Sequence, residues 1–190
     1  MKKLIAFSAL LLLLTPMSNL LAQAPAGFTA GYIITADGSR LEGFIKESFK
    51  GKAAIVFQPA TGKKVTYGGN AVNEVNIAGV SYISYANDFF KVVSNGAKAS
   101  LLQKVSDATG KVIYNGSEAA GISSGTEGRI NDLFVRTTGQ SVLTLVNKEN
   151  LNKVAGILFA DCPALLESAK AGQLQAAELE SIVARYNACK

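Results

Sequence analysis

The sequence of 190 residues contains no histidine and no tryptophan. Histidine is the usual general base of hydrolases and the commonest metal ligand, so its absence excludes the ordinary serine triad and histidine-based metal sites. The sequence also lacks the phosphate-binding pattern G-x-x-x-x-G-K-[ST], a D-x-D-x-D-G calcium loop and any close cluster of acidic residues. We therefore expect no metal and no other cofactor.

Long apolar runs are lacking beyond the N-terminus. Lys2 and Lys3 precede an apolar run from Leu4 to Leu14, and a region of small residues follows it. This pattern is typical of a secretory signal peptide, with cleavage after Ala22 or Ala24. The run of about eleven residues is shorter than the roughly 20 that a transmembrane helix needs. We therefore expect export and no transmembrane segment after removal of the signal.

The domain organisation follows from this boundary. A signal peptide over residues 1–24 leaves residues 25–190, which suffice for one exported domain with a hydrophobic core. Without Lys2 and Lys3, 17 basic and 14 acidic side chains remain, so the net charge falls from +5 to +3. So small an excess argues against nucleic-acid binding. We predict a periplasmic or secreted bacterial protein whose partner is an unknown envelope protein or glycan.

Cysteine is scarce, and the two that occur, Cys162 and Cys189, flank the predicted C-terminal helices. In an exported chain two cysteines usually pair, because the compartment is oxidising. A bond between them would close a loop of about 27 residues, worth roughly 3.5 kcal/mol in the chain-entropy model. The alternative is two free thiols, one of them a nucleophile, but no histidine is present to activate it. We predict a structural disulfide.

Strand-like segments fill residues 29–146. The first two, Tyr32 to Thr35 and Arg40 to Ile45, flank Asp37-Gly38, a pair that is typical of a tight hairpin turn. Further hairpins follow, and we expect about nine or ten strands in all. Between the later ones, the small and polar stretch from Asn115 to Gly128 predicts a long loop.

Residues 148–190 have helical patterns instead. Pro163 suits the first turn of a helix, and Gly172 suits its end. Apolar residues then recur at i, i+3, i+4 and i+7, at Leu179, Ile182, Val183 and Tyr186. Strands followed by helices predict an α+β fold: an antiparallel β-rich region, either a sandwich or an open barrel, followed by two or three C-terminal helices.

Three segments carry a resemblance to known sequences: GYIITADGSRLEGFI from Gly31, LFADCPALLES from Leu158 and IVARYNAC from Ile182. Together they resemble a group of exported proteins of Bacteroidota to which no activity is assigned. The resemblance implies export and the order of strands before helices, and it implies no catalytic or binding residue.

One short motif matches a pattern that is typical of hydrolases. Gly121 to Gly125 reads GISSG and matches G-x-S-x-G, but a nucleophile elbow needs a preceding strand, a following helix and a histidine. We interpret this stretch as a loop. Four aspartates near predicted turns have a local hydrogen-bonding role as the simplest explanation: Asp37, Asp88, Asp107 and Asp132.

Aromatic residues gather in the middle of the chain, and we predict a binding surface at Tyr82, Tyr85 and Phe89. The alternative is that these side chains pack under the helices, and alternation along a strand places Tyr82 and Tyr85 on opposite faces. The predicted function is a non-enzymatic envelope or secreted module that acts by binding or as a structural element. The alternative is a carboxylate- or serine-type hydrolase without a recognisable motif, which would show a pocket with converging acids.

Overall fold

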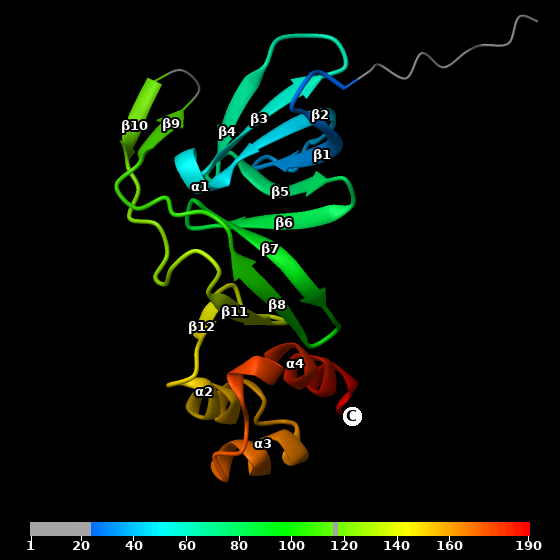
Figure 1. Cartoon of the computed structure of the whole chain (residues 1–190), viewed down its shortest axis with the longest axis vertical. Helices are drawn as coiled ribbons and strands as arrows, with labels where there is room; N and C mark the ends of the chain where they lie inside the picture. Colours follow the sequence, from blue (N-terminus) through cyan, green and yellow to red (C-terminus); the bar gives the residue numbers. More distant parts are fainter. Residues whose placement is uncertain (1–23, 116–117) are drawn as a thin grey trace, which may run out of the picture.

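The computed structural model describes residues 24–115 and 118–190, so all of the predicted signal peptide except its last residue lies outside the described residues. A ten-stranded antiparallel sheet dominates the fold, in the order β12-β11-β8-β7-β6-β5-β1-β2-β3-β4 (Figure 1). Its strands are β1 (Thr29–Thr35), β2 (Arg40–Ser48), β3 (Ala54–Pro59), β4 (Val65–Gly68), β5 (Val72–Ile77), β6 (Val80–Tyr85), β7 (Asp88–Asn95), β8 (Ala99–Lys104), β11 (Leu133–Thr137) and β12 (Thr144–Val146). A separate hairpin consists of β9 (Val112–Asn115) and β10 (Glu118–Ile122).

Helices follow the strands and gather at one end of the molecule (Figure 1). They are α2 (Leu151–Leu158), α3 (Pro163–Lys170) and α4 (Leu179–Ala188), with a 3-10 turn at Ala176–Glu178. The predicted α+β fold with C-terminal helices is therefore confirmed. In addition, a single turn, α1 (Phe49–Lys52), joins β2 to β3 and was not predicted. Among the described residues, no helix is long and apolar enough to cross a membrane.

Of the turns and loops predicted from the sequence, the hairpin at Asp37-Gly38 is confirmed and the long loop at Asn115 to Gly128 is only partly so. The Asp37-Gly38 hairpin forms: Gly38 has φ +86°, and hydrogen bonds from Thr35 and Ser39 lower the pKa of the Asp37 carboxyl. The predicted loop at Asn115 to Gly128 is partly wrong, because β10 lies inside it and pairs with β9. Small residues gave no alternating pattern there, so pairing of the backbone was not visible in the sequence.

The two faces of the sheet have different neighbours. We call inner the face that carries Phe89 and Leu101, and outer the face that carries Phe90 and Leu102. One inner cluster lies among β1 to β7, with fully buried Ile33 and Val75 among its members. A second inner cluster joins Leu101 to the helices.

The last helix buries the face that its spacing predicts. Leu179, Ile182, Val183 and Tyr186 are all buried in the cluster shared with β8 and β11. Asn187, next to this face, binds the β7–β8 connection: its Oδ1 accepts hydrogen bonds from the backbone N–H groups of Lys98 (2.9 Å) and Ala99 (2.8 Å), and its Nδ2 donates to the Ala99 carbonyl (2.9 Å). Apolar packing and this side chain together fix α4 on the sheet.

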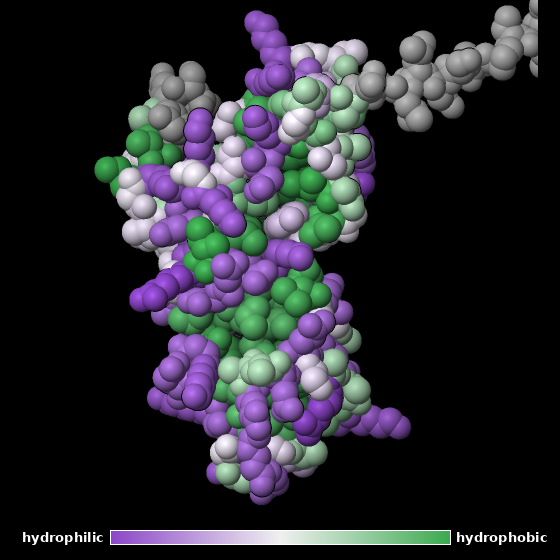
Figure 2. All heavy atoms as spheres, in the orientation of Figure 1, coloured by the Kyte–Doolittle hydropathy of each residue, from purple (hydrophilic) through white to green (hydrophobic). Residues whose placement is uncertain are grey.

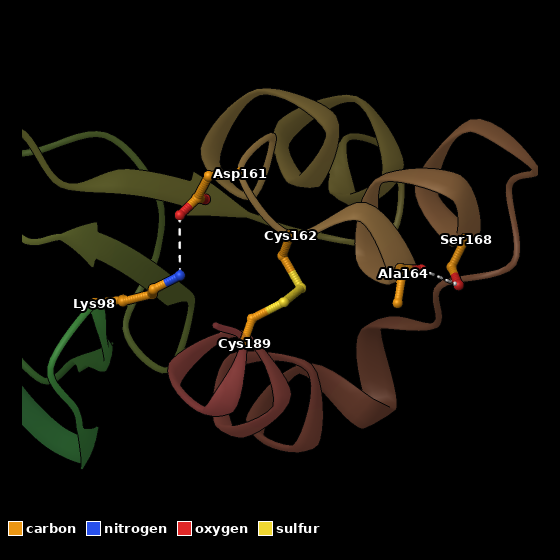
Figure 3. Close-up of a disulfide and its surroundings, with 6 residues drawn as sticks. All are labelled: Lys98, Asp161, Cys162, Ala164, Ser168 and Cys189. Atoms are coloured by element: carbon orange, nitrogen blue, oxygen red, sulfur yellow. Dashed lines mark hydrogen bonds and ion pairs between the residues drawn. A yellow bond between two sulfur atoms is a disulfide. The ribbon is translucent and has the colours of Figure 1, made fainter.

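The predicted disulfide is present between Cys162, just before α3, and Cys189, just after α4, with 5.8 Å between their Cα atoms (Figure 3). The alternative of two free thiols, one of them a nucleophile, is therefore excluded. Beside it, Lys98 forms an ion pair of 3.0 Å with Asp161. The bond ties the end of the chain to the start of the helical region.

Tyr186 allows a test of this packing. Burial, and then the neighbouring Asp161, raise the pKa of Tyr186 to about 12. Because an unfolded tyrosine ionises near pH 10, the neutral phenol stabilises the fold below pH 10, and this contribution is lost as the pH rises towards 12. In a spectroscopic titration, subtracting the Tyr186→Phe curve from the wild-type curve should give a midpoint near pH 12. A midpoint near pH 10 would mean that the ring is not packed as described.

Candidate functional site

The register of the paired strands decides which side chains lie together on the outer face of the sheet. Strand pairing places Asn95 of β7 opposite Ser100 of β8, and Ser100 opposite Arg136 of β11, so that three polar residues form a row across the sheet. The next row along the same strands is apolar, with Val92 opposite Leu102. A polar strip therefore borders an apolar one on a single surface.

The apolar part of the outer face has no helix packed on it. Its buried residues are Phe90, Leu102, Phe134 and Leu143, and no residue of a described helix belongs to this cluster. At its margin Ile83, Tyr85, Val92 and Leu145 are only partly buried. Figure 2 shows apolar residues gathered at mid-height, in the region where β7, β8, β11 and β12 lie in Figure 1. The apolar surface that this cluster presents is therefore limited to its margin.

A buried ion pair lies at the edge of this cluster. Asp88 and Lys104 have no exposed side-chain surface, and Lys104 Nζ lies 3.2 Å from Asp88 Oδ2. The second carboxylate oxygen accepts hydrogen bonds from Ser106 Oγ (2.8 Å) and from the Ala108 N–H (2.7 Å). Thr126 donates its N–H and its hydroxyl to Oδ2, both at 2.7 Å. The carboxylate is therefore fully paired, as a buried charge requires.

Lys104 in turn holds the segment that follows β10. Its ammonium donates to the backbone carbonyls of Thr126 (2.8 Å), Glu127 (3.3 Å) and Gly128 (3.2 Å). All the hydrogen-bonding capacity of this ammonium is directed at acceptors within the fold. We conclude that the pair anchors residues 126–128 against the sheet.

The G-x-S-x-G stretch belongs to the same anchored segment. Ser123 is buried, and its Oγ accepts hydrogen bonds from Asn87 Nδ2 (3.1 Å) and from the Gly125 N–H (3.0 Å). Gly125 has φ +62°, and a side chain there would collide with Thr109. β10 runs into this stretch and ends at Ile122, just before Ser123, and no described helix follows directly. The geometry is that of a tied loop and lacks the strand–turn–helix of a nucleophile elbow.

A polar hollow of about 300 Å³ opens at the end of the outer face, between the β7–β8 connection and the end of β11. Arg136 provides its charge, and every other residue lining it is a glycine or has a neutral polar side chain. Ser100 Oγ donates to Asn95 Oδ1 at 2.5 Å, which leaves the amide nitrogen of Asn95 without an intramolecular acceptor among the described residues. The Arg136 guanidinium likewise has no hydrogen-bonding or ionic partner within the described chain.

A second hollow of about 350 Å³ lies near the other edge of the sheet, where Leu41, Phe57 and Val65 line it together with an ion pair. That pair joins Arg40 Nη2 to Glu42 Oε1 at 2.7 Å. The lining of this hollow thus contains one carboxylate, and that of the first contains none. Neither presents two converging acids.

The predicted binding residues are divided between the two faces. Phe89 is fully buried on the inner face, where its ring centroid lies 4.9 Å from that of Phe49. Tyr82 lies on the same face, also 4.9 Å from Phe49, and burial raises the pKa of its hydroxyl. Tyr85 lies on the outer face, at the margin of the apolar cluster. The structure thus leaves only Tyr85 of the three beside the outer surface.

Local hydrogen bonds explain three of the four aspartates near turns, as predicted. Asp37 accepts from the Ser39 N–H, Asp107 from the Thr109 N–H, and Asp132 from the Arg129 N–H. Asp88 differs, because its partners also come from β8 and from the segment after β10. A lysine within the apolar strand 99–104 was the available signal, since a charge in such a strand needs a partner.

Comparison with protein-family models, with curated proteins and with solved structures found no match to this chain. The described residues contain no group of three or more His, Cys, Asp or Glu side chains that could hold a metal ion. What the outer face offers is an apolar strip, one unpaired guanidinium and a set of neutral hydrogen-bonding groups.

Proposed function

We propose that this protein is an exported binding module of the cell envelope or of the secreted fraction, and that its outer face contacts the ligand. The observation that carries the proposal is the asymmetry of the sheet. Helices α2 and α4 cover the inner face beside β7, β8 and β12, whereas no helix residue joins the outer cluster. The margin of that cluster is partly exposed, and a protein or glycan could bury it.

Two further features support the proposal. The segment that adjoins the outer surface is anchored to the sheet, because the Asp88–Lys104 pair hydrogen-bonds to it. The disulfide suits an oxidising compartment, as the leader-like N-terminus does. A hydrolase is the less favoured function, since neither hollow brings two acids together and Ser123 lacks a base.

Changes at the margin of the outer face should weaken ligand binding. The exported protein would be screened on a glycan array and against envelope extracts, and each ligand found would be measured with purified variants. Tyr85→Ser and Val92→Lys should each reduce affinity at least about tenfold, as loss of a central contact does. Both positions are partly exposed, so the fold should tolerate the changes.

The control is Ile157→Lys, because Ile157 is 67% exposed on α2, away from the outer face. This variant should bind like the wild type. Equal binding by all three variants would place the ligand elsewhere. Turnover of chromogenic esters, glycosides or peptides that Ser123→Ala abolishes would favour the hydrolase instead.

A further inference from the structure

We infer that the polar hollow beside Arg136 is a binding site for a small polyhydroxylated carboxylate, of the sugar-acid type. This inference rests on the proposed binding function and names the ligand class for one end of the outer face. Its basis is the combination of a single unpaired cation with a lining that contains no apolar side chain.

Arg136 is the one charged residue, among those described, that lines the hollow. Arg136 is only partly exposed and lines the hollow from β11, and its guanidinium forms no ion pair or hydrogen bond with another described residue. Three other cations near the sheet are paired: Lys104 with Asp88, Arg40 with Glu42, and Lys98 with Asp161. A guanidinium presents parallel N–H groups that match the two oxygens of a carboxylate. The hollow therefore selects for an anion.

The neutral lining narrows the class of anion. Asn95 has a free amide N–H₂, and the exposed Gln140 contributes a second amide. The hydroxyl groups of Ser100 and Thr138 donate their O–H to Asn95 Oδ1 (2.5 Å) and to the Ala97 carbonyl (2.6 Å), so each hydroxyl oxygen keeps lone pairs that can accept. Donors and acceptors around one charge suit a ligand with several hydroxyl groups beside its carboxylate.

Size and polarity argue against other occupants. A volume of about 300 Å³ lies at the low end for ligand sites, so one small unit fits, either free or as part of a polymer. A peptide terminus would bring an apolar or bulky side chain, for which this lining has no apolar partner. A doubly charged phosphate would meet one cation only. A sugar acid satisfies both the charge and the polarity.

The test uses the disulfide-bonded protein labelled with ¹⁵N and titrated with glucuronate. Saturable shifts are expected for the amides of residues 95–100 and 136–140, and glucose, acetate and inorganic phosphate should each bind at least about tenfold more weakly. Arg136→Gln should weaken glucuronate binding about 10- to 100-fold, and Arg136→Lys should weaken it less, because the charge remains but the paired N–H groups do not. Arg185→Gln, at an exposed arginine of α4, should have no effect.

Several results would overturn the inference. Absence of saturable shifts in the wild type would do so without recourse to any variant. If glucose bound as tightly as glucuronate, the charge would have no role, and if acetate did so, the hydroxyl groups would have none. If phosphate or glucose 6-sulfate bound more tightly than glucuronate, the site would take a different class of anion. If Tyr85→Ser and Val92→Lys still weaken binding of an envelope ligand at least about tenfold, the proposed function stands although the sugar-acid assignment fails.

Discussion

Lys104→Met is expected to lower the free energy of unfolding by about 3 to 5 kcal/mol, which is the usual cost of leaving one member of a buried ion pair without its partner. The variant removes the 3.2 Å contact to Asp88 and leaves the carboxylate in a site where neither side chain has exposed surface. It also removes the donor to three backbone carbonyls. Urea unfolding followed by circular dichroism measures the change.

A matched variant separates this effect from the general effect of replacing lysine. Lys170→Met breaks an exposed pair of 3.0 Å with Glu167 and should change stability by at most about 1 kcal/mol. Domains of this size have about 5 to 15 kcal/mol of stability, so the Lys104 variant should still fold, although less stably. Limited proteolysis should then cut it first near residues 123–128. Equal stability of the two variants would contradict the buried pair.

Reduction of the Cys162–Cys189 bond is expected to lower the free energy of unfolding by about 3.5 kcal/mol, because a closed loop with a sequence separation of 27 residues restricts the unfolded chain. Unfolding in urea with and without a reductant measures this difference. In the double variant with both cysteines changed to alanine, the reductant should have no effect. A wild-type protein whose stability is the same in both conditions would show that the bond does not stabilise this fold.

Mass spectrometry of the intact protein tests directly whether Cys162 and Cys189 are bonded. Protein recovered from the periplasm of a bacterial host, unfolded without reduction, should react with no alkylating reagent, and after reduction it should take up two equivalents. The same spectrum shows whether the leader is processed. Loss of residues 1–22 or 1–24 is the result expected from the export proposal, and retention of the full chain would contradict it.

Several features of the fold were determined by the sequence alone, because they depend on residues close together in the chain. The Asp37-Gly38 turn, the start of α3 at Pro163 and the buried face of α4 all formed where local patterns placed them. The disulfide was predictable for a different reason, since two cysteines allow one pairing. The order of strands before helices then predicted the α+β class.

The candidate site was decided only by the tertiary structure. The antiparallel register of β7, β8 and β11 aligns Asn95, Ser100 and Arg136 in one row. In the sequence β11 is separated from β8 by the β9–β10 hairpin and its flanking segments. A shift by one residue in that register would turn Arg136 to the inner face, and no local pattern determines it. Asp88 and Lys104 are paired for the same reason. Local chemistry therefore determined the elements and the disulfide, whereas long-range pairing determined which face has no described helix packed on it and which guanidinium is left unpaired.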